Sequence, residues 1–282
     1  MQPTQTLPSL AYTGKHLKSE TVSDVRHCFS AARLDCDLTM FIHCELLILI
    51  LVLMNDGQVQ TGEIIGGGEA APHSRPYMVL LERYLQNNKK AHCGGFLLNE
   101  DIVMTAAHCQ ARAYIVFLGV HDFQKTNEVQ RISVEQSFPH KDYNASNYKN
   151  DIMLLKLSSK AKYSNNVRPI ALANQDDGSL PKSCSTSGWG RTGKNSTYMS
   201  NVLMEVNVTL TDSEPCDGNN FYCSEGDSGP GRGDSGGPLV CGGMAYGVVS
   251  YNFKPHSGGR EINYYAKIPD NRRLINSTMI NA

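Results

Sequence analysis

From position 64 onward, short apolar runs alternate with breaks rich in Gly, Asn, Asp and Pro. The runs are enriched in Val, Ile, Leu and Tyr, and such runs between turn residues are typical of β-strands. They lie at 77–81, 95–98, 102–105, 114–118, 152–157, 202–208, 238–240 and 246–250. Many short strands at modest spacing predict an all-β barrel or sandwich. The tail from Pro269 to Ile275 is a candidate helix.

The N-terminal part of the chain reads differently. An apolar run at 46–54 is too short to span a bilayer as a free helix and fits the core of a signal peptide. Met40 lies just before it, so we expect a signal peptide at 40–57 and an upstream extension at 1–39 that is not in the mature protein. A signal anchor with a cytoplasmic tail is the alternative. Residues 58–63 would form a propeptide ending in Gly62-Glu63.

Composition narrows the class of protein. A chain of 282 residues can bury a sizeable core, as one large domain or two small ones. The formal net charge of −1 gives no reason to expect nucleic acid as a partner. Nine cysteines favour an oxidising compartment, and the absence of any Cys-x-x-Cys pair argues against a zinc site built from them. No carboxylate-rich calcium loop occurs around 119–131.

Three short motifs carry candidate chemistry. The stretch at 233–241 places Ser235 in a glycine-rich turn, where a hydroxyl can be exposed beside backbone N–H groups. The stretch at 105–109 supplies a base, His108, and the stretch at 150–155 supplies an acid, Asp151. Nucleophile, base and acid together are the components of acyl-transfer chemistry, and the chain order His, Asp, Ser separates one fold from others that use the same triad.

On these motifs the chain resembles the chymotrypsin-like serine proteases, and within them the granzyme and mast-cell protease group. The resemblance runs from Ile64 to about Ile275 and also covers the stretches at 64–67, 72–78, 93–96, 188–190 and 247–251. It implies a peptidase domain at 64–282 with two six-stranded antiparallel Greek-key β-barrels, at about 64–170 and 180–268, and a C-terminal helix at about 269–280. The family's usual tryptophan in that helix is replaced by Leu274, so we expect weaker docking.

The resemblance also assigns roles. Ser235 would be the nucleophile, His108 the general base and acid, and Asp151 the residue that orients the imidazole. The backbone N–H groups of Gly233 and Ser235 would form the oxyanion hole. Cleavage after Glu63 would free an ammonium on Ile64, which would pair with Asp234 and order that turn. Three disulfides are implied: Cys93–Cys109, Cys184–Cys241 and Cys216–Cys223. No cofactor or metal is expected.

Substrate-binding positions follow from the same alignment of motifs. Gly229 would form the base of the primary pocket, where an uncharged residue argues against cleavage after Lys or Arg. Asn252 and Asn263 would narrow or polarise that pocket, which favours a medium-sized, uncharged or polar residue before the scissile bond. Ser250, Tyr251 and Asn252 would pair with the substrate backbone as an added strand. A second Gly-Asp-Ser-Gly at 226–229 imitates the serine motif, but only Ser235 has the following Gly-Gly-Pro-Leu-Val at the family's spacing.

The implied partners are protein or peptide substrates, an activating dipeptidyl peptidase and serpin-type inhibitors, acting on a monomer that is secreted or stored in granules. No nucleic acid and no stable membrane span are expected. Asn144, Asn195, Asn207 and Asn276 lie in glycosylation sequons, and Asn207 is the least favoured because it falls in a predicted strand. Two alternatives stay open: a protease homologue that only binds, and a protease tethered by its N-terminal segment.

Overall fold

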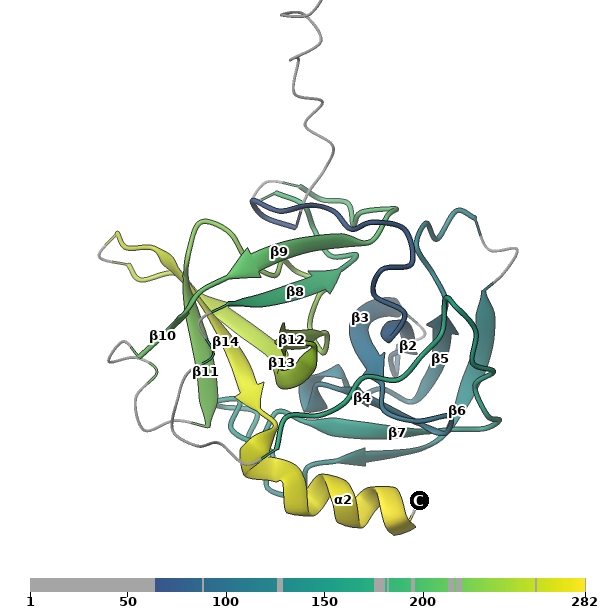
Figure 1. The fold of residues 1–282 in the computed structure, drawn as a ribbon. Helices are drawn as coiled ribbons and strands as arrows, with labels where there is room; N and C mark the ends of the chain where they lie inside the picture. The colour runs from purple at the N-terminus through teal and green to yellow at the C-terminus, as the bar shows by residue number, and fades with distance from the viewer. Residues whose placement is uncertain are drawn as a thin grey trace, which may run out of the picture. The chain divides into compact units, whose positions relative to one another are not determined.

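The computed structural model describes residues 64–281, apart from 88, 126–128, 175–180, 182, 194–195, 213–215, 217–219 and 257. The predicted extension, signal peptide and propeptide at 1–63 lie outside the described residues, as do Cys28, Cys36, Cys44 and Asn195. The fold class is confirmed: the described chain is mostly β, with two curled antiparallel sheets and one C-terminal α-helix (Figure 1).

The first sheet is a closed six-stranded barrel with the order β2-β3-β4-β7-β6-β5. Its strands are β2 (Met78–Tyr84), β3 (Lys90–Leu97), β4 (Ile102–Thr105), β5 (Ala113–Leu118), β6 (Gln130–Pro139) and β7 (Met153–Leu157). The barrel is held together by a core of fully buried aliphatic and aromatic side chains, among them Phe96, Val103 and Leu155. Closure pairs every edge, so no strand of this sheet is left with unpaired backbone groups on one side.

The second sheet has eight strands in the order β1-β9-β8-β12-β13-β14-β11-β10. They are β1 (Gly68–Glu69), β8 (Cys184–Gly188), β9 (Met204–Val208), β10 (Leu210–Thr211), β11 (Phe221–Gly226), β12 (Pro238–Cys241), β13 (Met244–Phe253) and β14 (Glu261–Lys267). β1 belongs to this sheet although it lies at the start of the predicted first half. It pairs with β9, and the side chain of Ile64 just before it is fully buried beside Met204 and Val206.

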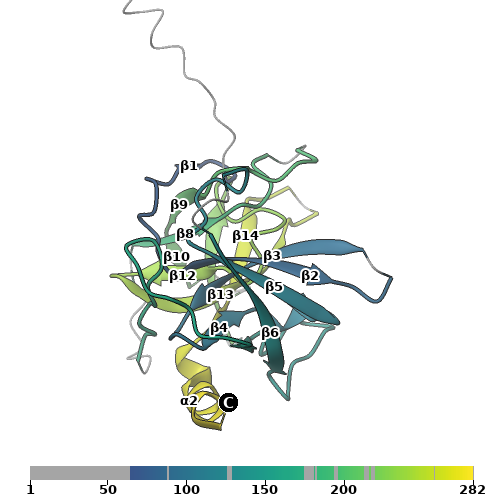
Figure 2. The same ribbon diagram turned by 90° about the vertical axis from the view of Figure 1, so that its right-hand side faces the viewer.

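The described chain also contains two short 3₁₀ helices, of which the first carries His108. A short 3₁₀ helix, η1 (Ala107–Cys109), is separated from the end of β4 by one residue. A second, η2 (Pro269–Asn271), leads into α2 (Arg272–Asn281), which lies below the strands in both views (Figures 1 and 2). Ile275 of α2 is 1% exposed and packs in the core, while Leu274 is only half-buried, so the helix is docked through the neighbour of the predicted position.

The described residues contain three disulfides, Cys93–Cys109, Cys184–Cys241 and Cys216–Cys223. The first ties β3 to the last residue of η1, which directly follows His108. The second ties β8 to β12, next to the turn that carries Ser235.

Candidate active site

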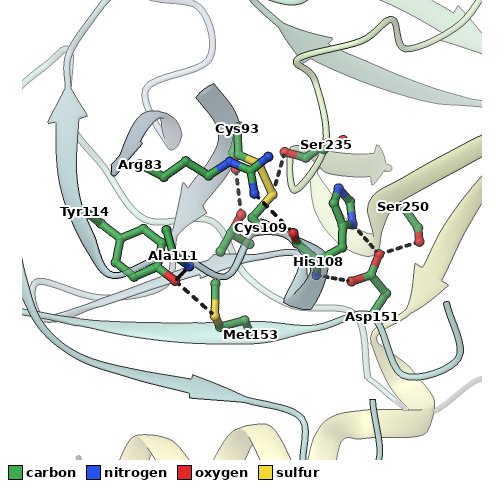
Figure 3. Close-up of a disulfide and its surroundings, with 12 residues drawn as sticks. Arg83, Cys93, His108, Cys109, Ala111, Tyr114, Asp151, Met153, Ser235 and Ser250 are labelled. Atoms are coloured by element: carbon green, nitrogen blue, oxygen red, sulfur yellow. Dashed lines mark hydrogen bonds and ion pairs between the residues drawn. A yellow bond between two sulfur atoms is a disulfide. The ribbon is translucent and has the colours of Figure 1, made fainter. Parts of the chain in front are cut away.

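His108 is the middle residue of η1, and its surroundings fix both its backbone and its ring. Its backbone N–H donates to Asp151 Oδ1 at 2.8 Å, and its ring Nδ1 lies 2.7 Å from Asp151 Oδ2 (Figure 3). The Arg83 guanidinium donates to the carbonyl oxygen of His108 at 3.1 Å. Because Nδ1 faces a carboxylate, the imidazole presents its Nε2 away from Asp151.

Asp151 lies two residues before the start of β7 and is fully buried. Asn150 before it has a φ of 58°, a left-handed conformation that Asn adopts more readily than most residues. The Ser250 hydroxyl donates to Asp151 Oδ2 at 2.5 Å (Figure 3). With the two groups of His108, three protein groups therefore surround this buried carboxylate, as a buried ionisable group requires.

Ser235 comes from the other sheet, in the turn before β12. Its carbonyl oxygen accepts the N–H of Gly94 from β3 at 2.8 Å, which ties the turn to the first barrel. Gly236 has a φ of 86°, and a Cβ there would lie 2.1 Å from Thr105 Oγ1, so only glycine fits. Ser235 and His108 line the same cavity of about 270 Å³. Among the described residues no hydrogen bond joins the two side chains, and such contacts often tighten only with substrate bound.

The turn around Ser235 presents two backbone donors. The N–H of Asp234 donates to Gly231 O at 3.1 Å and closes the turn. Within the described part of the chain, the N–H groups of Gly233 and Ser235 on either side of it have no protein acceptor. Two free N–H groups, one of them the N–H of the serine itself, form a site where an anionic oxygen can be stabilised.

Asp234 points away from these donors into the interior and is fully buried. Its carboxylate accepts the backbone N–H groups of Gly190 and Gly231, each at 2.7 Å. Gly190 has to be glycine because a Cβ there would lie 2.5 Å from the carboxylate. Burial raises the pKa of Asp234 to about 6. The two backbone donors lower this pKa, but their effect is smaller than that of burial. The described contacts of this carboxylate include no cation.

The hollow at Gly229 is nearly closed. A Cβ on Gly229 would lie 2.5 Å from Asn263 Nδ2, and the space between them has no room for a water molecule. Asn263 is 2% exposed and donates to Ser224 Oγ at 3.3 Å. Asn252 pairs with Asn263 across β13 and β14, but its side chain donates instead to Glu261 at 2.6 Å. Of the two asparagines, it is Asn263 that fills the hollow.

Comparison with known proteins decides the family. Residues 64–275 match the family model described as Trypsin, which is more than half of the chain. The chain belongs to the trypsin family of serine proteases. Membership makes it a serine-type endopeptidase of the hydrolase class.

Two curated relatives and one solved structure place this protease further. It is 40% identical to granzyme B(G,H) of Mus musculus over 248 residues, covering 83% of this chain and 98% of the relative. It is 41% identical to duodenase-1 of Bos taurus over 250 residues, covering 83% and 96%. The solved structure of GrC matches with a TM-score of 0.68 and 37% identity, covering 77% of this chain and 99% of that one. The protease is therefore of the granzyme and mast-cell type.

The structure adds one aromatic wall to the cleft of the protease that the motifs do not predict. The Tyr148 ring meets His108 edge-on at 5.8 Å between centroids and stacks on Tyr251 at 4.9 Å. Tyr251 in turn stacks on Tyr264 at 4.3 Å, and burial raises the pKa of Tyr251 to about 12, so its ring stays neutral. Tyr148 lies in a polar segment without periodicity. Its position three residues before the candidate acid is the only signal in the sequence.

Two further observations bear on cofactors and membranes. Among the described residues the one close group of three metal-binding side chains is Cys93, His108 and Cys109, but its cysteines are joined in a disulfide and offer no thiolate. In the same part of the chain, no helix is both long and apolar enough to cross a bilayer.

Proposed function

We propose that this protease cleaves peptide bonds through an acyl-enzyme formed on Ser235, with His108 as base and Asp151 as its orienting acid. The observation that carries the proposal is the hydrogen-bonded series from Ser250 through Asp151 to His108, which ends at the cavity shared with Ser235. His108 follows β4 of the first barrel and Ser235 precedes β12 of the second sheet, so the fold itself creates their proximity.

The reaction follows from these positions. The Ser235 hydroxyl attacks the substrate carbonyl while His108 Nε2 takes its proton, and Asp151 stabilises the imidazolium that forms. The N–H groups of Gly233 and Ser235 hold the oxyanion, and one such donor is typically worth about 100- to 1000-fold in rate. His108 then gives the proton to the leaving amine. Water hydrolyses the ester by the same steps in reverse.

Activation would occur at the buried Asp234. Removal of the segment that ends in Glu63, by a dipeptidyl peptidase, would give Ile64 an ammonium group. Ile64 is already buried, and Ile65 forms a bridge with Gly229, six residues before Ser235. An ammonium paired with Asp234 would remove the cost of ionising a buried carboxyl and would hold the Gly233 turn in place. The uncut chain would then be nearly inactive.

The primary specificity would be for a small, uncharged residue before the scissile bond. Gly229 offers no negative charge for Lys or Arg, and Asn263 occupies the depth that a large side chain would need. The sequence alone favours a medium-sized residue at this substrate position. A smaller residue is proposed here because the side chain of Asn263 leaves no free space next to Gly229. Ser250, Tyr251 and Asn252 line the cleft on β13, where a substrate strand would add.

Secretion or granule storage is part of the same proposal. Its support is the cysteine usage, the three disulfides and the likeness to granzymes and duodenase. Protein substrates and serpin-type inhibitors would be the partners. Asn144, Asn207 and Asn276 are exposed and would accept glycans, including Asn207, whose side chain faces outward from β9.

Peptide hydrolysis tests the proposal directly. The protein beginning at Ile64 is expected to cleave peptides with Ala or Ser before the scissile bond, and Ser235→Ala is expected to abolish turnover. If the wild-type form turns over no peptide in a library but binds proteins, it is the binding homologue. N-terminal sequencing of the secreted protein separates a free enzyme, which starts at Ile64, from a tethered one.

A further inference from the structure

A second cavity, of about 380 Å³, lies between the segment after β1 and the turn after β5. Its walls include Pro72, His73, Gly119, His121 and Asp122, and none of its lining residues lines the catalytic cavity. Two imidazoles and a carboxylate therefore meet at a site that the proposed reaction does not use.

One ring nitrogen of His121 is hydrogen-bonded and the other is buried without a partner among the described residues. Its Nε2 lies 2.8 Å from Glu69 Oε1, so the carboxylate accepts the proton on that nitrogen. In a neutral imidazole the other nitrogen, Nδ1, then carries a lone pair. That Nδ1 is buried and, among the described residues, has no hydrogen-bond partner, although the side chain is 12% exposed overall. A buried acceptor without a partner is costly and calls for an explanation.

His73 stands opposite this ring. The two ring centroids are 6.0 Å apart and the ring planes are inclined by 56°. His73 is exposed and has a φ of 58°, a conformation that non-glycine residues seldom adopt. With Zn–N bonds of about 2.1 Å, two imidazoles on one tetrahedral ion have centroids roughly 5.3 Å apart. A small rotation of the exposed His73 ring would satisfy that geometry.

We propose that His73 and His121 bind one divalent transition-metal ion of the kind that Zn²⁺ represents. Imidazole suits zinc, copper and nickel, and a metal-bound histidine usually gives its other N–H to a carboxylate, as His121 does to Glu69. Asp122 on the same wall already accepts the Gln124 N–H and pairs with Lys125, so it would contribute negative potential and not a direct ligand. Water molecules would occupy the remaining coordination positions of the ion.

The site would stabilise the part of the fold that surrounds Asp234. Glu69 lies in β1, five residues after Ile64, and β1 pairs with β9. The carbonyl oxygen of His121 accepts the indole N–H of Trp189 at 3.0 Å, and the next residue, Gly190, donates to Asp234. A metal that joins His73 to His121 would tie these segments together. This consequence rests on the proposed activation, whereas the metal site itself does not.

Calorimetric titration with Zn²⁺ alone, in chelator-free buffer, tests the site. The wild-type protein is expected to bind one ion per chain at this position. His73→Asn keeps a residue that tolerates the left-handed backbone, and it should weaken binding at least about tenfold. His121→Gln should do the same, and Glu69→Gln should cost about 10- to 100-fold through lost orientation. His256→Asn, a change at another exposed histidine, should leave the affinity unchanged.

His108→Gln separates this site from ion binding at the catalytic histidine, because the proposed site should survive in it. Zn²⁺ should also raise the thermal midpoint of the wild-type protein and not that of His73→Asn, a readout that does not depend on activity. The proposal is wrong if His73→Asn binds as tightly as wild type, if binding disappears only in His108→Gln, or if millimolar Zn²⁺ does not bind.

Discussion

Asp151 holds His108 at two points: Oδ1 accepts the backbone N–H of His108 at 2.8 Å, and Oδ2 lies 2.7 Å from its ring Nδ1. Asp151→Asn would place an amide NH₂ against Nδ1 and favour the tautomer whose Nε2 carries the proton. That nitrogen could no longer accept the Ser235 proton, so we expect kcat to fall by about 10⁴. Peptide turnover at neutral pH measures this.

Ser250→Ala provides the comparison. It removes one donor from Asp151 Oδ2 but leaves both contacts to His108, so the loss should be closer to about tenfold. If Asp151→Asn kept more than a tenth of the wild-type rate, the assigned role of Asp151 would be wrong.

Asp234 predicts a pH-dependent stability for the uncut chain. Burial raises its pKa from 3.8 to about 6, so the folded state holds this proton more tightly than the unfolded state does. The contribution of the protonated Asp234 to the free energy of unfolding is complete below pH 3.8 and is lost as the pH rises to about 6. One pKa unit corresponds to about 1.4 kcal/mol, so the loss should be about 3 kcal/mol.

Urea unfolding of the uncut chain carrying Ser235→Ala, with and without Asp234→Asn, checks this. The Asp234→Asn variant lacks the titrating group. The difference in unfolding free energy between the chains with Asp234 and with Asn at this position should therefore change between pH 3.8 and about 6. Parallel pH profiles would contradict the burial of a titrating carboxyl at this position. In the chain that begins at Ile64, pairing with the ammonium should lower the pKa and remove the effect.

Asn263 predicts how specificity can be changed. Asn263→Gly should open the primary pocket and raise kcat/KM at least about tenfold for peptides with a large apolar residue before the scissile bond. Gly229→Asp alone should not create cleavage after Arg, because its Cβ would meet Asn263 Nδ2 at 2.5 Å. The double variant should create it. Arg cleavage by Gly229→Asp alone would show that Asn263 does not close the pocket.

The packing of helix α2 predicts that substitutions of its neighbouring residues Ile275 and Leu274 destabilise the protein to different extents. Ile275 is 1% exposed and packs in the core, so Ile275→Ala should lower the free energy of unfolding by about 2–5 kcal/mol. Leu274 is half-buried, so Leu274→Ala should cost less than about half of that. Chemical denaturation of both variants gives the comparison. Equal losses would mean that Leu274 docks the helix as well as Ile275 does.

Eight strands of the fold were predictable from apolar runs, and β4 agrees at both ends. Six strands of the described chain were not predicted: β1, β6, β8, β10, β11 and β14. β8 reads Cys-Ser-Thr-Ser-Gly, and β6 mixes Arg, Glu and Gln with its apolar residues. Their strand state comes from pairing with neighbours far along the chain, because β propensity depends mainly on that context.

The site divides in the same way. His108, Asp151 and Ser235 lie in short motifs, so the sequence could identify them as candidates. In the structure His108 and Ser235 line one cavity, and Asp151 is hydrogen-bonded to His108. Tyr148 and Arg232 also line that cavity but have no motif. The closure of the pocket by Asn263 depends on the pairing of β14 with β11 and β13, which sequence spacing does not encode.

The most direct test of the account is to treat the protein with a fluorophosphonate and identify the modified residue by mass spectrometry. The chain that begins at Ile64 should be modified at Ser235 alone. The chain extended through Glu63 should react far more slowly, Ser235→Ala should not react, and Ser228→Ala in the neighbouring Gly-Asp-Ser-Gly should still react. Modification at another residue, or equal labelling with and without the extension, would contradict the account.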